Sequence, residues 1–140
     1  MTIEFDDTLI TKNEMIDSQH KELIARIKKF VDSCENRDSK ITAINMLDYL
    51  TEYTEFHFSA EEKLQAEVGY PGLEDHKKKH EEFKATLRSL DAFLDESEGP
   101  TEDFVAQVKK NVVDWLFNHI KTFDRSVAEY IFMTENPDRL

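Results

Sequence analysis

Apolar residues recur at steps of three and four along four separate segments of this 140-residue chain. That spacing marks one face of an α-helix, which turns once in about 3.6 residues. Only three Gly and three Pro occur, so few positions can break a helix. The sequence therefore predicts one all-α domain over residues 1–140, an up-down-up-down antiparallel four-helix bundle with short connections.

The first segment is preceded by residues 1–10, which mix acidic and apolar side chains and are expected to form an N-terminal arm packed on the body. Thr11 and Glu14 have the spacing of a capping box, so we expect the first helix to begin there. Polar residues after Cys34 end this helix, and Asp38 or Ser39 can cap the second. The inward face of the first helix is predicted to contain Ile16, His20, Leu23, Ile24, Ile27, Val31 and Cys34.

The second and third helices are predicted on either side of the turn-forming segment 69–72, and the third begins at about Leu73. The expected inward face of the second helix is Ile41, Ile44, Leu47, Leu50, Tyr53 or Thr54, His57, Glu61, Leu64 and Val68. The expected inward face of the third is His76, His80, Phe83, Leu87, Leu90 and Leu94.

The fourth helix follows a break at residues 98–101, where Thr101 can cap it and Glu102 and Asp103 suit its first turn. Asn136-Pro137 is expected to close the helix. Its inward face is predicted to contain Val105, Val108, Val112, Leu116, His119, Phe123, Val127 and Ile131.

The formal net charge of −12 excludes whole classes of partner. Nucleic-acid binding needs clustered Lys and Arg, and docking on an anionic membrane surface needs them too. The N-terminus lacks the basic start and apolar run of a signal peptide, and no apolar stretch is long enough to span a bilayer. We therefore expect a cytoplasmic protein that binds neither nucleic acid nor membrane.

Cys34 is the only cysteine, so no internal disulfide can form. It lies at helical spacing from Ile27 and Val31 on the inward face of the first helix. This position favours a small buried hydrophobic residue over a reactive thiol.

All five histidines of the chain fall on the predicted inward faces. His57 and Glu61 are four residues apart on the second helix, and His76 and His80 repeat this spacing on the third. Residues one turn apart point the same way, so each pair can grip one metal ion. His20 and His119 add one imidazole each from the other two helices. A single inward histidine is usually a hydrogen-bonded core residue, but five on converging faces indicate a metal centre.

Asp124 does not fit the helical period. It follows His119 by five residues, which rotates it by about 140° on an ideal helix. It can reach the same site only by a side-chain swing or by a local widening such as a π-bulge. Periodicity alone does not select it.

The ligand types restrict the metal. The set holds more groups than a tetrahedral structural zinc site accepts, and all-oxygen Mg or Ca sites do not use imidazoles. Mixed imidazole and carboxylate ligands suit iron or manganese, and two bridging carboxylates suit a pair of ions.

Four segments resemble the hemerythrin family, and its bacterial single-domain members in particular. They are residues 16–21 with His20, residues 57–62 with the HxxxE pattern, residues 70–80 with Tyr-Pro and HxxxH, and residues 115–124 with HxxxxD. The patterns occur in the family's order and cover nearly the whole chain.

The resemblance implies the ligands and the function. His76, His80 and His119 would hold one iron, His20 and His57 the other, and Glu61 and Asp124 would bridge them with an oxo or hydroxo group. The expected function is reversible dioxygen binding, for carriage, storage, delivery or sensing, with O2 held as hydroperoxide at the five-coordinate iron of this non-haem di-iron centre.

Reversible binding requires an open metal position walled by apolar groups. Leu116, one turn before His119, lies where this wall is needed and matches a leucine of the family's oxygen pocket; Ile24, one turn after His20, can add to it. Trp115, Phe56 and Phe58 are interpreted as packing residues.

Three positions depart from the family's common residues: Phe5 and Gln65 stand where Trp and Met are common, and Gly is common near Asn13. None of the three is an expected ligand. Two other functions stay open. One is an enzyme that reduces peroxide or nitric oxide, for which no cofactor motif is evident; the other is an iron- or oxygen-sensing module that acts through an unidentified protein partner. We expect no enzymatic activity and a monomer or weak homo-oligomer.

Overall fold

The structure is a computed structural model that describes residues 3–36 and 39–135. Three long helices come first: α1 (Glu14–Glu35), α2 (Lys40–Glu67) and α3 (Leu73–Glu96). A fourth helical rod spans residues 102–135. It consists of α4 (Glu102–Val108), the π-helical η2 (Lys109–Asp114), α5 (Trp115–His119), the π-helical η3 (Ile120–Asp124) and α6 (Arg125–Glu135).

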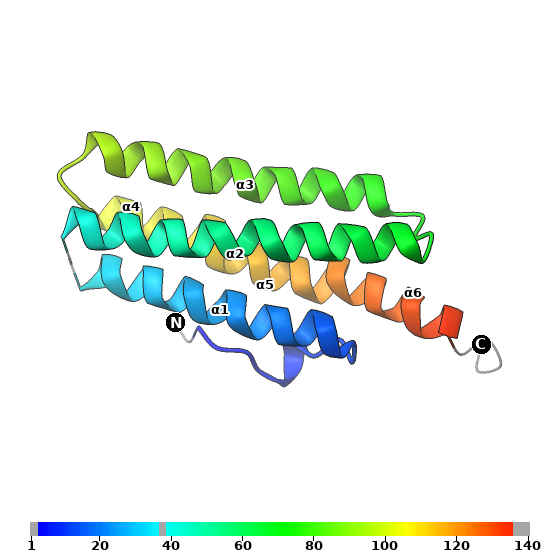
Figure 1. Ribbon diagram of the computed structural model, residues 1–140. Helices are drawn as coiled ribbons and strands as arrows, with labels where there is room; N and C mark the ends of the chain where they lie inside the picture. The colour runs from blue at the N-terminus through cyan, green and yellow to red at the C-terminus, as the bar shows by residue number, and fades with distance from the viewer. Residues whose placement is uncertain (1–2, 37–38, 136–140) are drawn as a thin grey trace.

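The four rods lie side by side and run alternately up and down (Figure 1). Helix α1 packs on α2, α2 packs on α3, and the fourth rod contacts both α1 and α3, which closes the bundle. None of the described residues lies in a strand. The predicted all-α, up-down-up-down four-helix bundle is confirmed.

The N-terminal arm runs along the outside of α1 and contains the short 3-10 helix η1 (Asp7–Leu9) (Figure 1). Ile3 and Leu9 of the arm are buried, and Phe5 packs against the core, whereas Ile10 is exposed. Arg125 of α6 donates a hydrogen bond to the backbone oxygen of Thr8. The arm is thus packed on the body, as the sequence predicts.

The apolar core is divided into two clusters. On α2 the larger cluster extends to Phe58, and the smaller one begins at Leu64. On the fourth rod the larger cluster extends to Ile120 and the smaller one begins at Val127. The stretch of each helix between the clusters carries buried polar side chains, so a polar layer interrupts the core.

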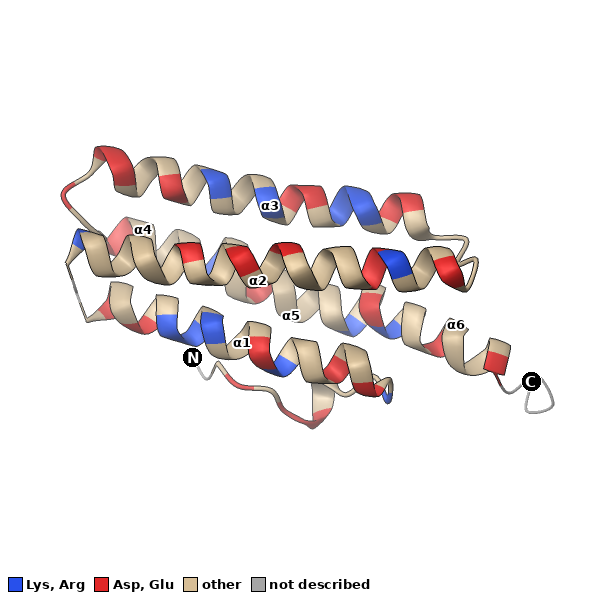
Figure 2. Cartoon of the chain, viewed as in Figure 1, with Lys and Arg blue, Asp and Glu red and all other residues tan. Residues whose placement is uncertain are grey.

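Charged residues of both signs are distributed along the outside of the helices (Figure 2). The three consecutive lysines of α3 illustrate the pattern: Lys78 is exposed, Lys77 pairs with Glu74 and Lys79 pairs with Glu82. Within the described ranges, no helix combines the length and apolar character needed to cross a bilayer.

The start of α1 differs from the predicted capping box. Asn13 is the N-cap, and its side chain accepts a hydrogen bond from the backbone N–H of Ile16. The Asp17 carboxylate accepts hydrogen bonds from the backbone N–H and hydroxyl of Thr11 and from the backbone N–H of Lys12, whose φ is +70°. Asp17 therefore accepts the hydrogen bond from the Thr11 backbone that the sequence pattern predicted for Glu14. The left-handed conformation of Lys12 brings Thr11 back over the first turns of α1.

The other helix starts agree with the sequence: Ser39 caps α2, Leu73 begins α3 and Thr101 caps α4. Asp38 and Asn136-Pro137 lie outside the described residues. The predicted burial of Cys34 is confirmed.

The inward position predicted for Ile41 was wrong, as was the packing role predicted for Phe56: the two side chains are 71 % and 57 % exposed. On α2 the buried face runs through Ala43, Leu47 and Leu50 instead. Ile41 lies two residues from Ala43, which places it on the opposite side of the helix.

We expect Asp17→Ala to lower the free energy of unfolding by about 1–3 kcal/mol, because it leaves two partly buried donors of Thr11, and the exposed N–H of Lys12, without their acceptor. Asp32→Ala is the matched control, since it removes the same charge from α1 but only an exposed pair with Lys28, worth about 0.3–0.5 kcal/mol. Urea unfolding of both variants measures the difference, and equal losses would contradict the role of Asp17.

Candidate metal centre

The polar layer of the bundle contains all seven residues that the sequence analysis singled out. They are buried, and they come from all four rods: His20 from α1, His57 and Glu61 from α2, His76 and His80 from α3, His119 from α5 and Asp124 from η3. The structure therefore brings together every predicted candidate ligand.

Helical spacing accounts for six of these seven positions. The pairs on α2 and α3 stand one turn apart and face the bundle axis, and the lysines between His76 and His80 face outward. His20 and His119 lie on the inward faces of their own helices. These six were predictable because an α-helix repeats its facing direction every three to four residues.

Asp124 reaches the same layer because the helix widens. Residues Ile120–Asp124 form the π-helical turn η3, which holds more residues per turn than an α-helix. Asp124 is 0 % exposed, whereas Phe123, which the regular period placed inward, is only partly buried. Of the two routes open to Asp124, the local widening is the one observed.

The seven side chains form two overlapping groups that could each hold a metal ion. The first group contains Glu61, His76, His80, His119 and Asp124, and the second contains His20, His57, Glu61 and Asp124. Within each group the candidate ligand atoms lie within 4.8 Å of one another. Glu61 and Asp124 belong to both groups, so they stand where bridging carboxylates would stand.

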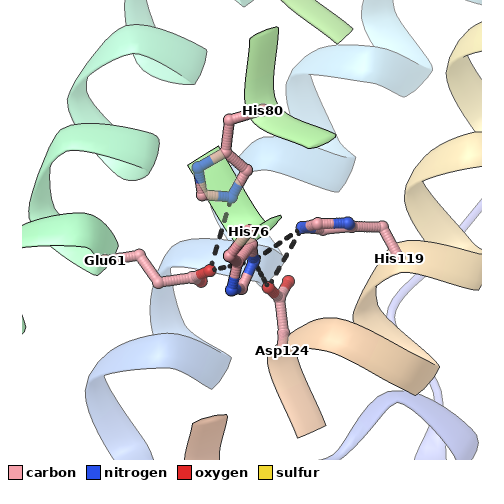
Figure 3. Close-up of side chains that lie close together, drawn as sticks. All are labelled: Glu61, His76, His80, His119 and Asp124. Carbon is pink, nitrogen blue, oxygen red and sulfur yellow. Dashed lines mark hydrogen bonds and ion pairs between the residues drawn. The ribbon is translucent and has the colours of Figure 1, made fainter. Parts of the chain in front are cut away.

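The five members of the first group converge on one point from α2, α3 and the fourth rod (Figure 3). His76 Nε2 lies 2.9 Å from Glu61 Oε1 and 3.0 Å from Asp124 Oδ1. In the second group, His20 Nε2 lies 2.8 Å from Asp124 Oδ2, and His57 Nε2 lies 3.4 Å from Glu61 Oε2.

Several of these inward atoms lack a hydrogen bond. Among the described residues, the buried atoms without a partner include Nε2 of His20, Nε2 of His80 and both carboxylate oxygens of Glu61 and Asp124. A buried polar group left unpaired costs about 1–3 kcal/mol, more when it is charged. Metal ions accept these lone pairs and offset the carboxylate charges, so the residues fit a metal centre.

Burial and mutual charge shift the pKa values of the candidate ligands. Burial, together with the charge of His20, lowers the pKa of His57 to about 3, and burial with His76 lowers that of His80 to about 2. Burial opposes the charging of His76, but the two neighbouring carboxylates outweigh it and raise its pKa to about 9.

The pKa values of the two candidate carboxylate ligands shift in opposite directions. Burial and the charge of Asp124 raise the pKa of Glu61 well above its usual value. Burial acts in the same direction on Asp124, but the charges of the close imidazoles of His119 and His20 hold its pKa well below the usual range.

Three of the imidazoles have an outer partner at Nδ1. His57 is 2.8 Å from Gln19 Oε1, His80 is 2.7 Å from Glu62 Oε2, and His76 is 2.9 Å from Gln65 Nε2. Such partners fix the ring orientation and tautomer of metal-bound histidines. The sequence analysis did not assign these three roles. The one available signal was the position of Gln65, which lies one turn after Glu61 on the buried face of α2.

Aromatic rings stack on the candidate ligands. Phe58 lies parallel to His80 with ring centroids 3.8 Å apart, and Trp115 lies parallel to His119 at 4.6 Å. Phe58 is fully buried and Trp115 partly buried, both against the core, so packing roles for these two are confirmed. Leu116 and Ile24 are also buried in the larger apolar cluster.

The sequence of residues 11–131 matches the family described as the Hemerythrin HHE cation binding domain. The chain belongs to the hemerythrin family. This hemerythrin domain is 36 % identical over 120 residues to a myohemerythrin of Riftia pachyptila, with 86 % of each chain covered. It is 30 % identical over 127 residues to a bacteriohemerythrin of Pseudomonas aeruginosa strain LESB58, which covers 91 % of this chain and 80 % of the relative.

A solved structure of wild-type hemerythrin superimposes on the hemerythrin domain with a TM-score of 0.72 and 26 % sequence identity. The superposition covers 83 % of this chain and 86 % of the other. The comparisons therefore establish the family, and the structure shows a four-helix bundle with a buried polar layer that could bind metal.

We expect the affinity of the hemerythrin domain for ferrous ion to rise with pH, from roughly pH 7 to about 9. In the metal-free centre, His76 keeps a proton up to its raised pKa of about 9, and the raised pKa of Glu61 acts in the same direction. Metal binding must displace these protons, so acid weakens it. Anaerobic competition with a coloured chelator at several pH values measures this dependence. A flat profile would contradict the assigned shifts.

Proposed function

We propose that this hemerythrin-family domain binds dioxygen reversibly at a pair of non-haem iron ions. The proposed ligands of one ion are His76, His80 and His119, and those of the other are His20 and His57. Glu61 and Asp124 would bridge the two. The family membership and the pairing of imidazoles with shared carboxylates support this assignment.

The two groups contain unequal numbers of imidazoles, and this difference is the observation on which the proposal rests. One group offers three imidazoles and two carboxylates, and the other offers two imidazoles and the same two carboxylates. With one ligand fewer, the second position keeps room for a small molecule. The iron pair, when bound, supplies two electrons and this open coordination position.

The surroundings of the centre suit a reversible reaction, because the chain can keep water and proton donors away from it. Ile24 and Leu116 are 2 % and 0 % exposed and belong to the larger apolar cluster. Ile24 stands one turn from His20, so it lies on the side of the two-histidine group. The apolar clusters on either side of the polar layer exclude bulk water from it.

The side chains also hold the centre in a fixed geometry. Glu62, Gln65 and Gln19 contact Nδ1 of three of the imidazoles, and aromatic rings stack on two of them. Because the seven proposed ligands come from all four rods, metal binding would stabilise the packing of the whole bundle.

An optical spectrum of the ferrous protein with and without O2 tests the function. We expect an absorption band that develops with O2 and disappears when O2 is removed, over repeated cycles, in protein that holds two iron ions per chain. His57→Ala should bind less iron and lose the response, whereas Phe56→Ala, a change at the exposed neighbouring ring, should keep both.

Irreversible oxidation in a single exposure would contradict reversible binding. Steady consumption of peroxide or nitric oxide with an added reductant, faster than autoxidation, would favour the enzymatic alternative.

We expect Leu116→Ala to raise the autoxidation rate several-fold, because the lost side chain opens the apolar wall to water. Leu87→Ala is the matched control: it also truncates a buried leucine, but two turns beyond His80 on α3. Both variants should lose about 2–5 kcal/mol of stability. The decay of the oxygenated band under air measures the rate, and equal acceleration in both would show that Leu116 does not guard the centre.

A further inference from the structure

Gln65 is a buried polar side chain beside the candidate metal centre. It lies on α2 one turn after Glu61 and is 0 % exposed. Its amide contacts the ring of His76, with Gln65 Nε2 2.9 Å from His76 Nδ1. The other amide atom, Oε1, is buried without a hydrogen-bond partner among the described residues.

The opposite ring nitrogen of His76 faces the centre. His76 Nε2 lies 2.9 Å from Glu61 Oε1 and 3.0 Å from Asp124 Oδ1, and it belongs to the five-residue group. A metal ion at Nε2 occupies its lone pair, so the proton of the neutral ring is then on Nδ1. Nδ1–H is a donor and needs an acceptor.

Within the part of the chain that the structure describes, the Gln65 amide is the hydrogen-bond partner of Nδ1 of His76, and its oxygen can serve as that acceptor. His76 is fully buried, so water does not replace it. Turning the Gln65 amide by 180° exchanges two atoms of nearly equal size and brings Oε1 to Nδ1. The turn satisfies the ring proton and gives the unpartnered oxygen a partner in one step.

We propose that Gln65 is a positioning residue for the centre: its amide oxygen accepts the Nδ1–H of His76, which fixes the tautomer and the ring plane that present Nε2 to the metal. The inference rests on the proposed assignment of His76 as a ligand. Glu62 and Gln19 hold Nδ1 of His80 and His57 in comparable contacts. Without Gln65, Nδ1 of His76 would be buried and unpaired.

Three variants on α2 test the role of Gln65. Gln65→Met, the residue common at this position in the family, keeps the length of the side chain but replaces the amide oxygen by a thioether sulfur, which is a much weaker acceptor. Gln65→Glu keeps an acceptor oxygen. Thr54→Val is the control for lost stability, since Thr54 is equally buried but its hydroxyl donates only to the backbone oxygen of Leu50. Each protein is loaded anaerobically with ferrous ion and its iron is counted. Iron release to a ferrous-specific chelator is then timed.

We expect Gln65→Met to release iron about 10-fold faster than the unaltered protein or more, as for loss of other outer partners of metal-bound histidines. Gln65→Glu should release it no faster, and Thr54→Val should match the unaltered protein. In the proton NMR spectrum of the ferrous form, one exchangeable imidazole N–H signal should shift in Gln65→Met and persist in Gln65→Glu.

Unchanged release and unchanged N–H signals in Gln65→Met would overturn the inference, as would equal acceleration in Thr54→Val. If Gln65→Met does not fold, Gln65→Glu decides: release at the unaltered rate supports the role and faster release overturns it. Failure of the unaltered protein to bind two iron ions would instead contradict the ligand assignment itself, because that result is read from the iron count and not from the rates.

Discussion

The burial of two carboxylates and five imidazoles in one layer of the bundle is the constraint on which the rest of the structure depends. Charge placed in an apolar interior is costly unless it is compensated. Glu61 and Asp124 face imidazole nitrogens on every side, and their opposite pKa shifts show how strongly the residues act on each other. Cations in this layer would offset much of that cost, so metal binding would be coupled to the stability of the fold.

The layer is supported from outside as well as from within. Outer partners hold Nδ1 of three imidazoles, and parallel aromatic rings hold two. The partners differ in kind. The carboxylate next to His80 is a stronger hydrogen-bond acceptor for the ring N–H than the amide next to His76 or His57. The two candidate ligand groups thus differ in their outer hydrogen bonds as well as in their number of imidazoles.

The sequence predicted the fold and six of the seven candidate ligands, because both depend on the α-helical repeat of side-chain direction. Where the backbone departs from that repeat, the prediction failed or stayed open. Phe123 had the expected inward spacing, but η3 turned Asp124 inward in its place. At the start of α1, a left-handed residue brought Asp17 to Thr11, a contact that no short capping pattern contains. Ala43 was passed over because a small residue gives a weak periodic signal, and the face of α2 was assigned to Ile41 instead.

The π-helical turn η3 makes the winding of the backbone between His119 and Asp124 as important as the identity of the two residues. If the residues of η3 wound as an ordinary α-helix, Asp124 would be rotated by about 140° from His119 and its carboxylate would be directed away from the polar layer. Every imidazole would remain in place, but the two candidate ligand groups would lose a carboxylate that they share. In this fold, the winding of one helical turn decides whether the two groups share both carboxylates or Glu61 alone.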